Sequence, residues 1–133
     1  MSGIFLDSNV ILYLLSADAS KADIAEALLS QQPTISVQVL NEITSVCQRK
    51  LKMPWVETLE LLAAVKATCT VVPLTVETHA RAVQIARQHP LSFFDAHIVA
   101  TAMGCGAHTL MSEDMHDGLS LQGLRIKNPF SVR

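Results

Sequence analysis

Short strand-like runs alternate with longer helical patterns along this chain, and this alternation limits the folds that it can adopt. The first run, Gly3–Leu6, is apolar without interruption, and similar short runs occur at 34–37, 70–74 and 108–111. A short continuous apolar run is typical of a strand that is buried on both faces of a parallel sheet. The sequence therefore predicts a three-layer α/β/α sandwich with a short, mostly parallel sheet of four to five strands.

Capping and breaking residues predict where the helices begin and end. Ser36 and Thr75 are typical N-caps, and Pro54 suits the first turn of a helix. The residues from Ser92 to Asp95 have the spacing of a capping box. We expect helices over about 10–15, 20–31, 36–51, 54–68, 75–89 and 92–103, and a last edge strand over 124–127.

Composition excludes several classes of protein. The chain has 133 residues, of which 50% are hydrophobic and 17% charged, with a formal net charge of −2. These values predict one folded domain over residues 1–133 rather than a disordered chain. No run of about 18 apolar residues is present, so we expect no membrane span. Three scattered cysteines favour reduced thiols, and with no readable secretory signal we expect a cytoplasmic location. The apolar excess suggests a surface for a partner.

Four carboxylates are expected at one edge of the predicted sheet. Asp7 and Asp114 follow the strands at 3–6 and 108–111, and the carboxyl ends of parallel strands share an edge. Glu42 and Asp95 lie in the apolar stripes of their helices, near the helix starts. Each acid alone has a plain structural explanation, such as a helix cap for Asp7 or a solvated loop position for Asp114. Four of them at one end of the sheet point to a shared role.

Converging carboxylates repel one another and raise each other's pKa unless a positive charge lies among them. No Lys or Arg close to these acids in the sequence plainly supplies that charge. Oxygen ligands select hard cations, so the set predicts Mg²⁺, with Mn²⁺ as the alternative. A partly hydrated Mg²⁺ held by carboxylates suits the hydrolysis of phosphodiester bonds.

The segments around these acids resemble the four motifs of PIN-domain ribonucleases, in the order of that family. They read IFLDSN at 4–9, SVQVLNE at 36–42, LSFFDA at 91–96 and LMSEDMHDG at 110–118. The resemblance covers residues 3 to 130 and is strongest to the VapC-type toxins of bacterial type II toxin–antitoxin modules. It implies a PIN-like fold and a metal-dependent endoribonuclease that acts as a toxin.

The resemblance also implies roles for particular residues. Asp7, Glu42, Asp95 and Asp114 match the acidic quartet of the family, as catalytic residues and Mg²⁺ ligands. Asn9 and Ser112 match polar positions that support the quartet through hydrogen bonds. Asp117 competes with Asp114 for the fourth position, and Asp114 is preferred because it is nearer the strand end. His116 lies in the same loop, where a substrate contact is the alternative to a solvated side chain.

The implied partners are an RNA substrate, a cognate antitoxin protein and a second copy of the chain in a homodimer. The interface stays unassigned: the candidate apolar segments are Trp55, Leu59 and Leu62, or Leu12, Tyr13 and Leu15. Arg49, Lys50 and Lys52 form a small basic cluster at a helix end, where RNA contact is the alternative to a favourable charge at the helix terminus. Two other functions remain open, a receiver-like Mg²⁺-binding phosphoacceptor domain and a catalytically silent PIN-fold binding protein.

Overall fold

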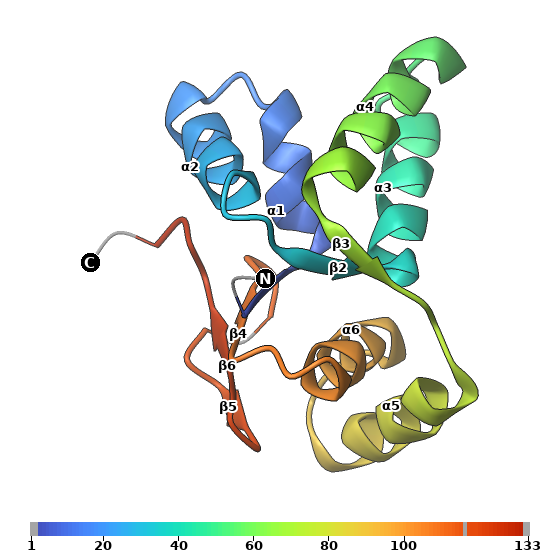
Figure 1. The fold of residues 1–133 in the computed structure, drawn as a ribbon, viewed down its shortest axis with the longest axis vertical. Helices are drawn as coiled ribbons and strands as arrows, with labels where there is room; N and C mark the ends of the chain where they lie inside the picture. Colours follow the sequence, from blue (N-terminus) through green and yellow to red (C-terminus); the bar gives the residue numbers. More distant parts are fainter. Residues whose placement is uncertain (1–2, 116, 132–133) are drawn as a thin grey trace.

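A computed structural model describes residues 3–115 and 117–131, and it has a six-stranded sheet between two layers of helices. The elements in chain order are β1 (Ile4–Leu6), α1 (Ser8–Leu12), a 3₁₀ helix η1 (Tyr13–Leu15), α2 (Ala19–Leu29), β2 (Thr34–Ser36), α3 (Val37–Arg49), α4 (Trp55–Thr68), β3 (Thr70–Val72), α5 (Val76–Gln88), α6 (Phe93–Gly104), β4 (Thr109–Met111), β5 (Ser120–Leu121) and β6 (Leu124–Lys127). In Figure 1, α1 to α4 lie above the sheet, and α5 and α6 lie below it. The predicted three-layer α/β fold is confirmed.

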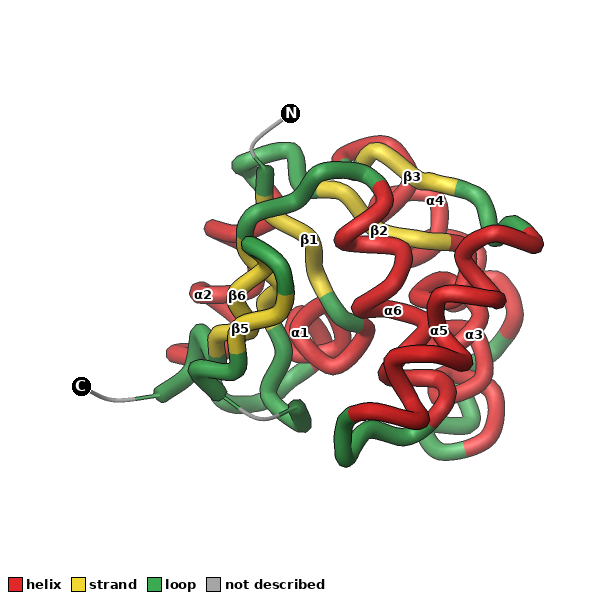
Figure 2. The backbone as a smooth tube through the Cα atoms, turned by 90° about the horizontal axis from the view of Figure 1, so that it is seen from below, coloured by secondary structure: helices red, strands yellow, loops and turns green. Residues whose placement is uncertain are grey.

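The strand order is β3-β2-β1-β4-β6-β5, and every neighbouring pair is parallel except β5 with β6. The central strand β1 therefore lies between β2 and β4, and because it is parallel to both, the carboxyl ends of the three strands share one edge of the sheet. Figure 2 shows β1 beside β2. Two details of the prediction were wrong. The sheet has six strands and not four to five. The sequence did not predict β5, because a strand of two residues is too short to leave a pattern. As a result β6 is an inner strand, and β5 is the edge.

The helix starts agree closely with the capping pattern. Ser36, Thr75 and Ser92 cap α3, α5 and α6 through their side chains. The reciprocal capping box is at the start of α5, between Thr75 and Thr78, whereas at α6 the Ser92 hydroxyl accepts a hydrogen bond from the backbone N–H of Asp95 at 3.1 Å. The helix expected at 10–15 is instead the short α1 followed by the 3₁₀ turn η1.

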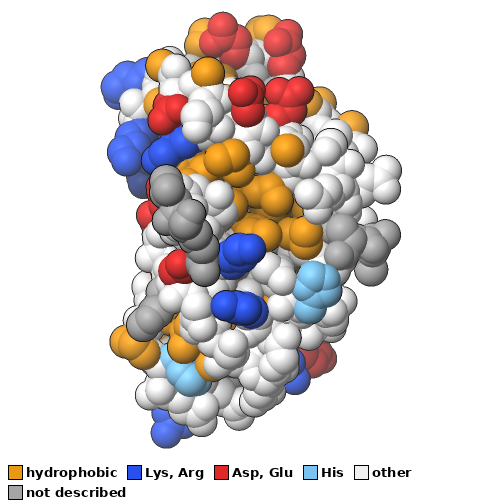
Figure 3. Space-filling view, turned by 90° about the vertical axis from the view of Figure 1, so that its left-hand side faces the viewer, with side chains coloured by type: hydrophobic (Ala, Val, Ile, Leu, Met, Phe, Trp, Pro, Cys, Tyr) orange, Lys and Arg blue, Asp and Glu red, His pale blue; other side chains and the backbone are white. Residues whose placement is uncertain are grey.

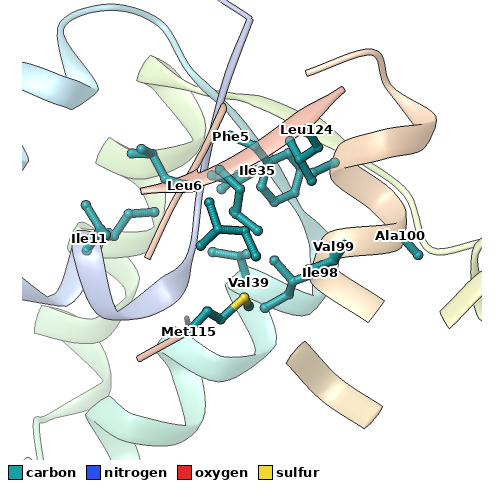
Figure 4. Packing of buried hydrophobic residues seen from close by; sticks show 14 of the residues in the cluster. Phe5, Leu6, Ile11, Ile35, Val39, Ile98, Val99, Ala100, Met115 and Leu124 are labelled. Atoms are coloured by element: carbon teal, nitrogen blue, oxygen red, sulfur yellow. The ribbon is translucent and has the colours of Figure 1, made fainter. Parts of the chain in front are cut away.

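The core fills both faces of the central strands. Phe5, Ile35 and Leu110 lie on β1, β2 and β4 and are completely buried. Figure 4 shows Ile98 and Val99 of α6 packed in the same cluster as side chains from β1, β2 and α3. Because α6 is buried almost all round, its position relative to β2 and α3 is set by tight packing. The start of α6, which carries Asp95, is thereby held in place.

Three observations bear on the sequence expectations. Within the described residues, no helix is both long and apolar enough to span a membrane. The three cysteines are free thiols. Figure 3 shows the face on which α2 and the C-terminal segment lie, where apolar side chains gather with Lys and Arg beside them. A hollow of about 430 Å³ on these elements is lined by Ile24, Ala27, Leu28, Met111, Lys127, Asn128, Pro129 and Ser131.

The packing of the sheet leads to a stability prediction. Leu110→Ala should lower the free energy of unfolding by about 2–5 kcal/mol, because it removes a fully buried side chain from an inner strand and leaves a cavity. Leu59→Ala is the matched control, since Leu59 on α4 is 59% exposed and its loss should change stability by about 0.5 kcal/mol or less. Urea denaturation measures both, and equal losses would contradict this placement of the core.

Candidate active site

Asp7 directly follows β1, and its buried carboxylate is the centre of a hydrogen-bond network. One carboxylate oxygen accepts from the backbone N–H of Ser8 at 2.7 Å, which caps α1. The other accepts from the hydroxyl of Ser112 at 2.7 Å and the amide of Asn9 at 3.2 Å. The backbone N–H of Asp7 donates to the carbonyl of Met111 at 2.9 Å, which joins the ends of β1 and β4. Asn9 and Ser112 thus both form hydrogen bonds with Asp7.

Glu42 lies on α3 and is tied to the same network through Ser8. The Ser8 hydroxyl donates to Oε1 of Glu42 at 2.7 Å and lies 3.5 Å from Oδ1 of Asp7. The side-chain amide of Gln38 donates to Oε2 of Glu42 at 3.0 Å. Sequence reasoning missed Gln38, although its position one helical turn before Glu42 was a readable signal, since residues i and i+4 are neighbours on a helix surface.

Asp95 on α6 and Asp114 in the loop after β4 are the other two acids of the predicted group. Asp95 is half-buried in the first turn of α6, and Asp114 is exposed in the loop after β4. Burial raises the pKa of Asp95, and the negative charges of Glu42 and Asp114 raise it further, against an opposing effect of Ser92. Asp7, Glu42 and Asp95 therefore interact electrostatically at the carboxyl edge of the sheet, and Asp114 interacts with Asp95.

Asp117 and Asp114, the two candidates for the fourth acid, make different contacts. The carboxylate of Asp117 accepts a hydrogen bond from the backbone N–H of Asn128 at 2.8 Å, so it ties the loop to the segment after β6. The negative charge of Asp114 acts on Asp95. Asp114 therefore interacts with the acidic group through Asp95, and its choice as the fourth acid stays a prediction. His116 lies outside the described residues.

The buried position of Asp7 has a large electrostatic consequence. Burial raises the pKa of its carboxyl to about 7, and the nearby charges of Glu42 and Asp95 raise it as well. The hydrogen bonds from Ser112 and Ser8 act in the opposite direction but do not offset burial. Among the described residues, none of the four acids forms an ion pair with Lys or Arg. In the described part of the site, these carboxylates are therefore not paired with a basic side chain that would stabilise their negative charge.

The donor set can be tested against a metal ion. Over residues 3–115 and 117–131, no three His, Cys, Asp or Glu side chains are grouped closely enough to hold a metal by themselves. Mg²⁺, however, usually keeps several waters and takes only one or two protein carboxylates. Oxygen donors with a raised pKa and no protein counter-ion fit such a partly hydrated cation. They do not fit a cage built wholly from protein ligands.

A second network beside the acids was not expected from the sequence. The backbone N–H of Glu113 donates to the side-chain carbonyl of Asn9 at 3.1 Å, which links the loop after β4 to the network around Asp7. The Glu113 carboxylate accepts from the Tyr13 hydroxyl at 2.5 Å and pairs with Lys21 at 3.2 Å. These contacts join residues about 100 positions apart, so a local sequence pattern does not predict them. They fix the loop that carries Asp114.

Comparison with known proteins gives a consistent result. A family model described as the PIN domain matches residues 4–116. The structure is similar to a toxin–antitoxin complex from Klebsiella pneumoniae (19% identity, 97% of this chain and 99% of that chain, TM-score 0.75) and to VapBC2 from Rickettsia felis bound to a promoter DNA fragment (17%, 94% and 97%, 0.69). It is also similar to VapC20 of Mycobacterium tuberculosis, a Sarcin-Ricin loop cleaving toxin (20%, 80% and 86%, 0.62). No curated protein matches the sequence.

The raised pKa of Asp7 predicts how stability depends on pH without metal. Between the unfolded value of 3.8 and about 7, the folded protein binds more protons than the unfolded chain. The contribution of Asp7 to stability is therefore fully present at pH values below about 4 and falls as the pH rises toward 7. The loss should reach a few kcal/mol, since each pKa unit corresponds to about 1.36 kcal/mol.

Asp7→Asn should remove most of this dependence, because its side chain does not ionise. Thermal unfolding of both proteins in a chelator across this pH range measures the effect. The same decrease in the variant would show that Asp7 is not its source.

Proposed function

Because the chain belongs to the PIN domain family, we propose that it is a metal-dependent endoribonuclease and the toxin of a toxin–antitoxin module. The proposed catalytic residues are Asp7, Glu42, Asp95 and Asp114, which would hold a partly hydrated Mg²⁺ directly or through its waters, with Asn9 and Ser112 in support. The single observation that carries the proposal is the acidic group itself. A protein that keeps Asp7 buried among other carboxylates without a protein cation bears an electrostatic cost that a bound divalent cation would relieve.

The surrounding residues suit this chemistry because they hold the carboxylates in defined orientations. Ser112 and Asn9 orient Asp7, and Ser8 holds Asp7 and Glu42 beside each other. A divalent cation bound here would supply positive charge to a phosphodiester and activate a water for attack. Asp114 is the exposed member of the group, so it is the carboxylate best able to orient that water and accept its proton.

Of the two alternative functions, one is disfavoured by topology. A receiver-like domain has the flavodoxin-like strand order 2-1-3-4-5. The order found here, β3-β2-β1-β4-β6-β5, is different. A catalytically silent binding protein with this fold remains the rival, and the presence of all four acids favours the enzyme.

The proposed protein partners are an antitoxin and a second copy of the chain, with the complex in the cytoplasm. Support comes from the similar solved structures, several of which are toxin–antitoxin complexes. The chain also exposes apolar side chains, including Trp55, Val56 and Leu59 in one stretch of α4. Large exposed apolar groups that lie together commonly mark protein interfaces.

The central experiment is RNA cleavage by the Asp7→Asn variant. We expect at least a hundredfold loss of cleavage of total RNA, because the substitution removes an anionic ligand while keeping its shape. Asp23→Asn is the matched control, since Asp23 is an exposed acid on α2 and its loss should leave cleavage unchanged. Mapping the cleavage ends on total RNA would identify the target. A purified, metal-loaded protein that cleaves no RNA would support the silent alternative.

A second experiment tests the metal without relying on activity. Millimolar Mg²⁺ should raise the melting temperature of the wild-type protein, because a ligand that binds only the folded state stabilises it by mass action. The shift should disappear in Asp95→Asn and persist in Asp23→Asn. A melting temperature that does not respond to Mg²⁺ or Mn²⁺ would contradict a divalent-cation site.

A further inference from the structure

A cavity of about 360 Å³ opens beside the acidic group, and we call it the side groove. Its size is within the range of ligand pockets, about 300–1,000 Å³. The walls come from α1, η1, the end of α3 and the loop after β4. Its lining includes Asn9, Leu12, Leu15, Lys50, Leu51 and Asp114.

The side groove is continuous with the acidic group through two of its lining residues. Asn9 lines the groove and donates its amide to the carboxylate of Asp7. Asp114 also lines it, and its charge acts on Asp95. A molecule in the groove therefore lies next to the place where a phosphodiester would be cleaved.

The wall that carries Tyr13 is held rigidly before any ligand binds. The Tyr13 ring packs against Phe130 with ring centroids 4.6 Å apart, and the ammonium of Lys21 lies 4.6 Å from the centre of the Tyr13 ring. The Tyr13 hydroxyl donates to Glu113, which is also paired with Lys21. A preformed wall reduces the entropy lost on binding.

The charges of the groove favour an anionic occupant. Glu113 is neutralised by Lys21, and Asp114 belongs to the group that is proposed to face a divalent cation. Lys50 remains as the cationic lining residue, and it has no ion-pair partner among the described residues. Arg49 and Lys52, both exposed, flank it in the chain. An exposed ammonium group without a carboxylate partner among the described residues suits a phosphate of a nucleic-acid backbone.

We propose that Lys50 is a substrate-positioning residue, which binds a backbone phosphate of single-stranded RNA lying in the side groove. The inference rests on the proposed nuclease function. The apolar lining from Leu12, Leu15 and Leu51 would contact a base or sugar without selecting its identity. This contact holds the neighbouring phosphodiester at the acidic group. Lys50 acts on binding and has no part in proton transfer.

Binding of a labelled single-stranded RNA oligonucleotide over a range of salt concentrations tests the proposal. The titrations use Asp7→Asn protein, with a parallel series on wild-type protein in a chelator. Lys50→Gln should weaken binding at low salt by roughly fivefold. It should also make the slope of log affinity against log salt less steep by about 0.7, the value for one phosphate contact with a single strand. Lys50→Arg should restore both quantities.

Two controls separate this role from a structural one. Lys66→Gln, an exposed cation on α4 outside the groove, should change neither the affinity nor the slope. In protein with Asp7 intact, Lys50→Gln should raise KM roughly fivefold with little change in kcat, and its melting temperature should match the wild type because Lys50 is exposed.

The outcomes distinguish this inference from the proposed function. If the wild-type protein neither binds nor cleaves RNA, the nuclease function itself fails. If it cleaves RNA but Lys50→Gln keeps the wild-type slope and KM, only the role of Lys50 is overturned. That second result, together with weaker binding of an acidic peptide by the variant, would assign the side groove to a protein partner.

Discussion

The burial of the Asp7 carboxylate is the constraint on which the rest of the site depends. A carboxylate taken out of water is costly unless hydrogen bonds or a counter-ion compensate for the lost solvation. The compensating donors come from α1 and from the loop after β4, at the ends of two neighbouring strands. Satisfying this one group therefore aligns β1 and β4 and orients the start of α1. The remaining acids are arranged around that fixed point.

The acidic group lowers the stability of the fold. Hydrogen bonds to Asp7 favour its charged form, but burial and the neighbouring acids outweigh them, so that its pKa is raised to about 7. The apolar packing of the sheet and α6 supplies the stability that keeps these charges together. Strongly perturbed pKa values are common at functional sites, where a bound ligand can offset the repulsion between carboxylates.

Beyond the acids, the contacts divide into an inner and an outer network. The inner one contains Ser8, Asn9 and Ser112, which touch Asp7 directly. The outer one joins Tyr13, Lys21 and Glu113, and it holds both the loop that carries Asp114 and one wall of the side groove. Asn9 belongs to both, because its amide group donates to Asp7 and accepts from the backbone of Glu113. Asn9 therefore links the Asp7 carboxylate to the wall of the side groove.

The sequence by itself determined the layered α/β fold, the N-caps at Ser36, Thr75 and Ser92, and the three acids at strand and helix ends, Asp7, Asp95 and Asp114. Glu42 lies in the middle of α3. These properties depend on periodicity and on neighbours a few residues apart, so a local pattern carries them. The pattern was too weak for the two-residue β5, and it did not separate α1 from η1.

Only the tertiary structure decided which side chains meet. It joined Ser8 to Glu42 across 34 positions and Tyr13 to Glu113 across 100, and it made Lys50 part of a groove beside the acids. The physical reason is that such contacts follow from strand register and helix packing, which are collective results of the whole core. No short segment of the chain contains that information.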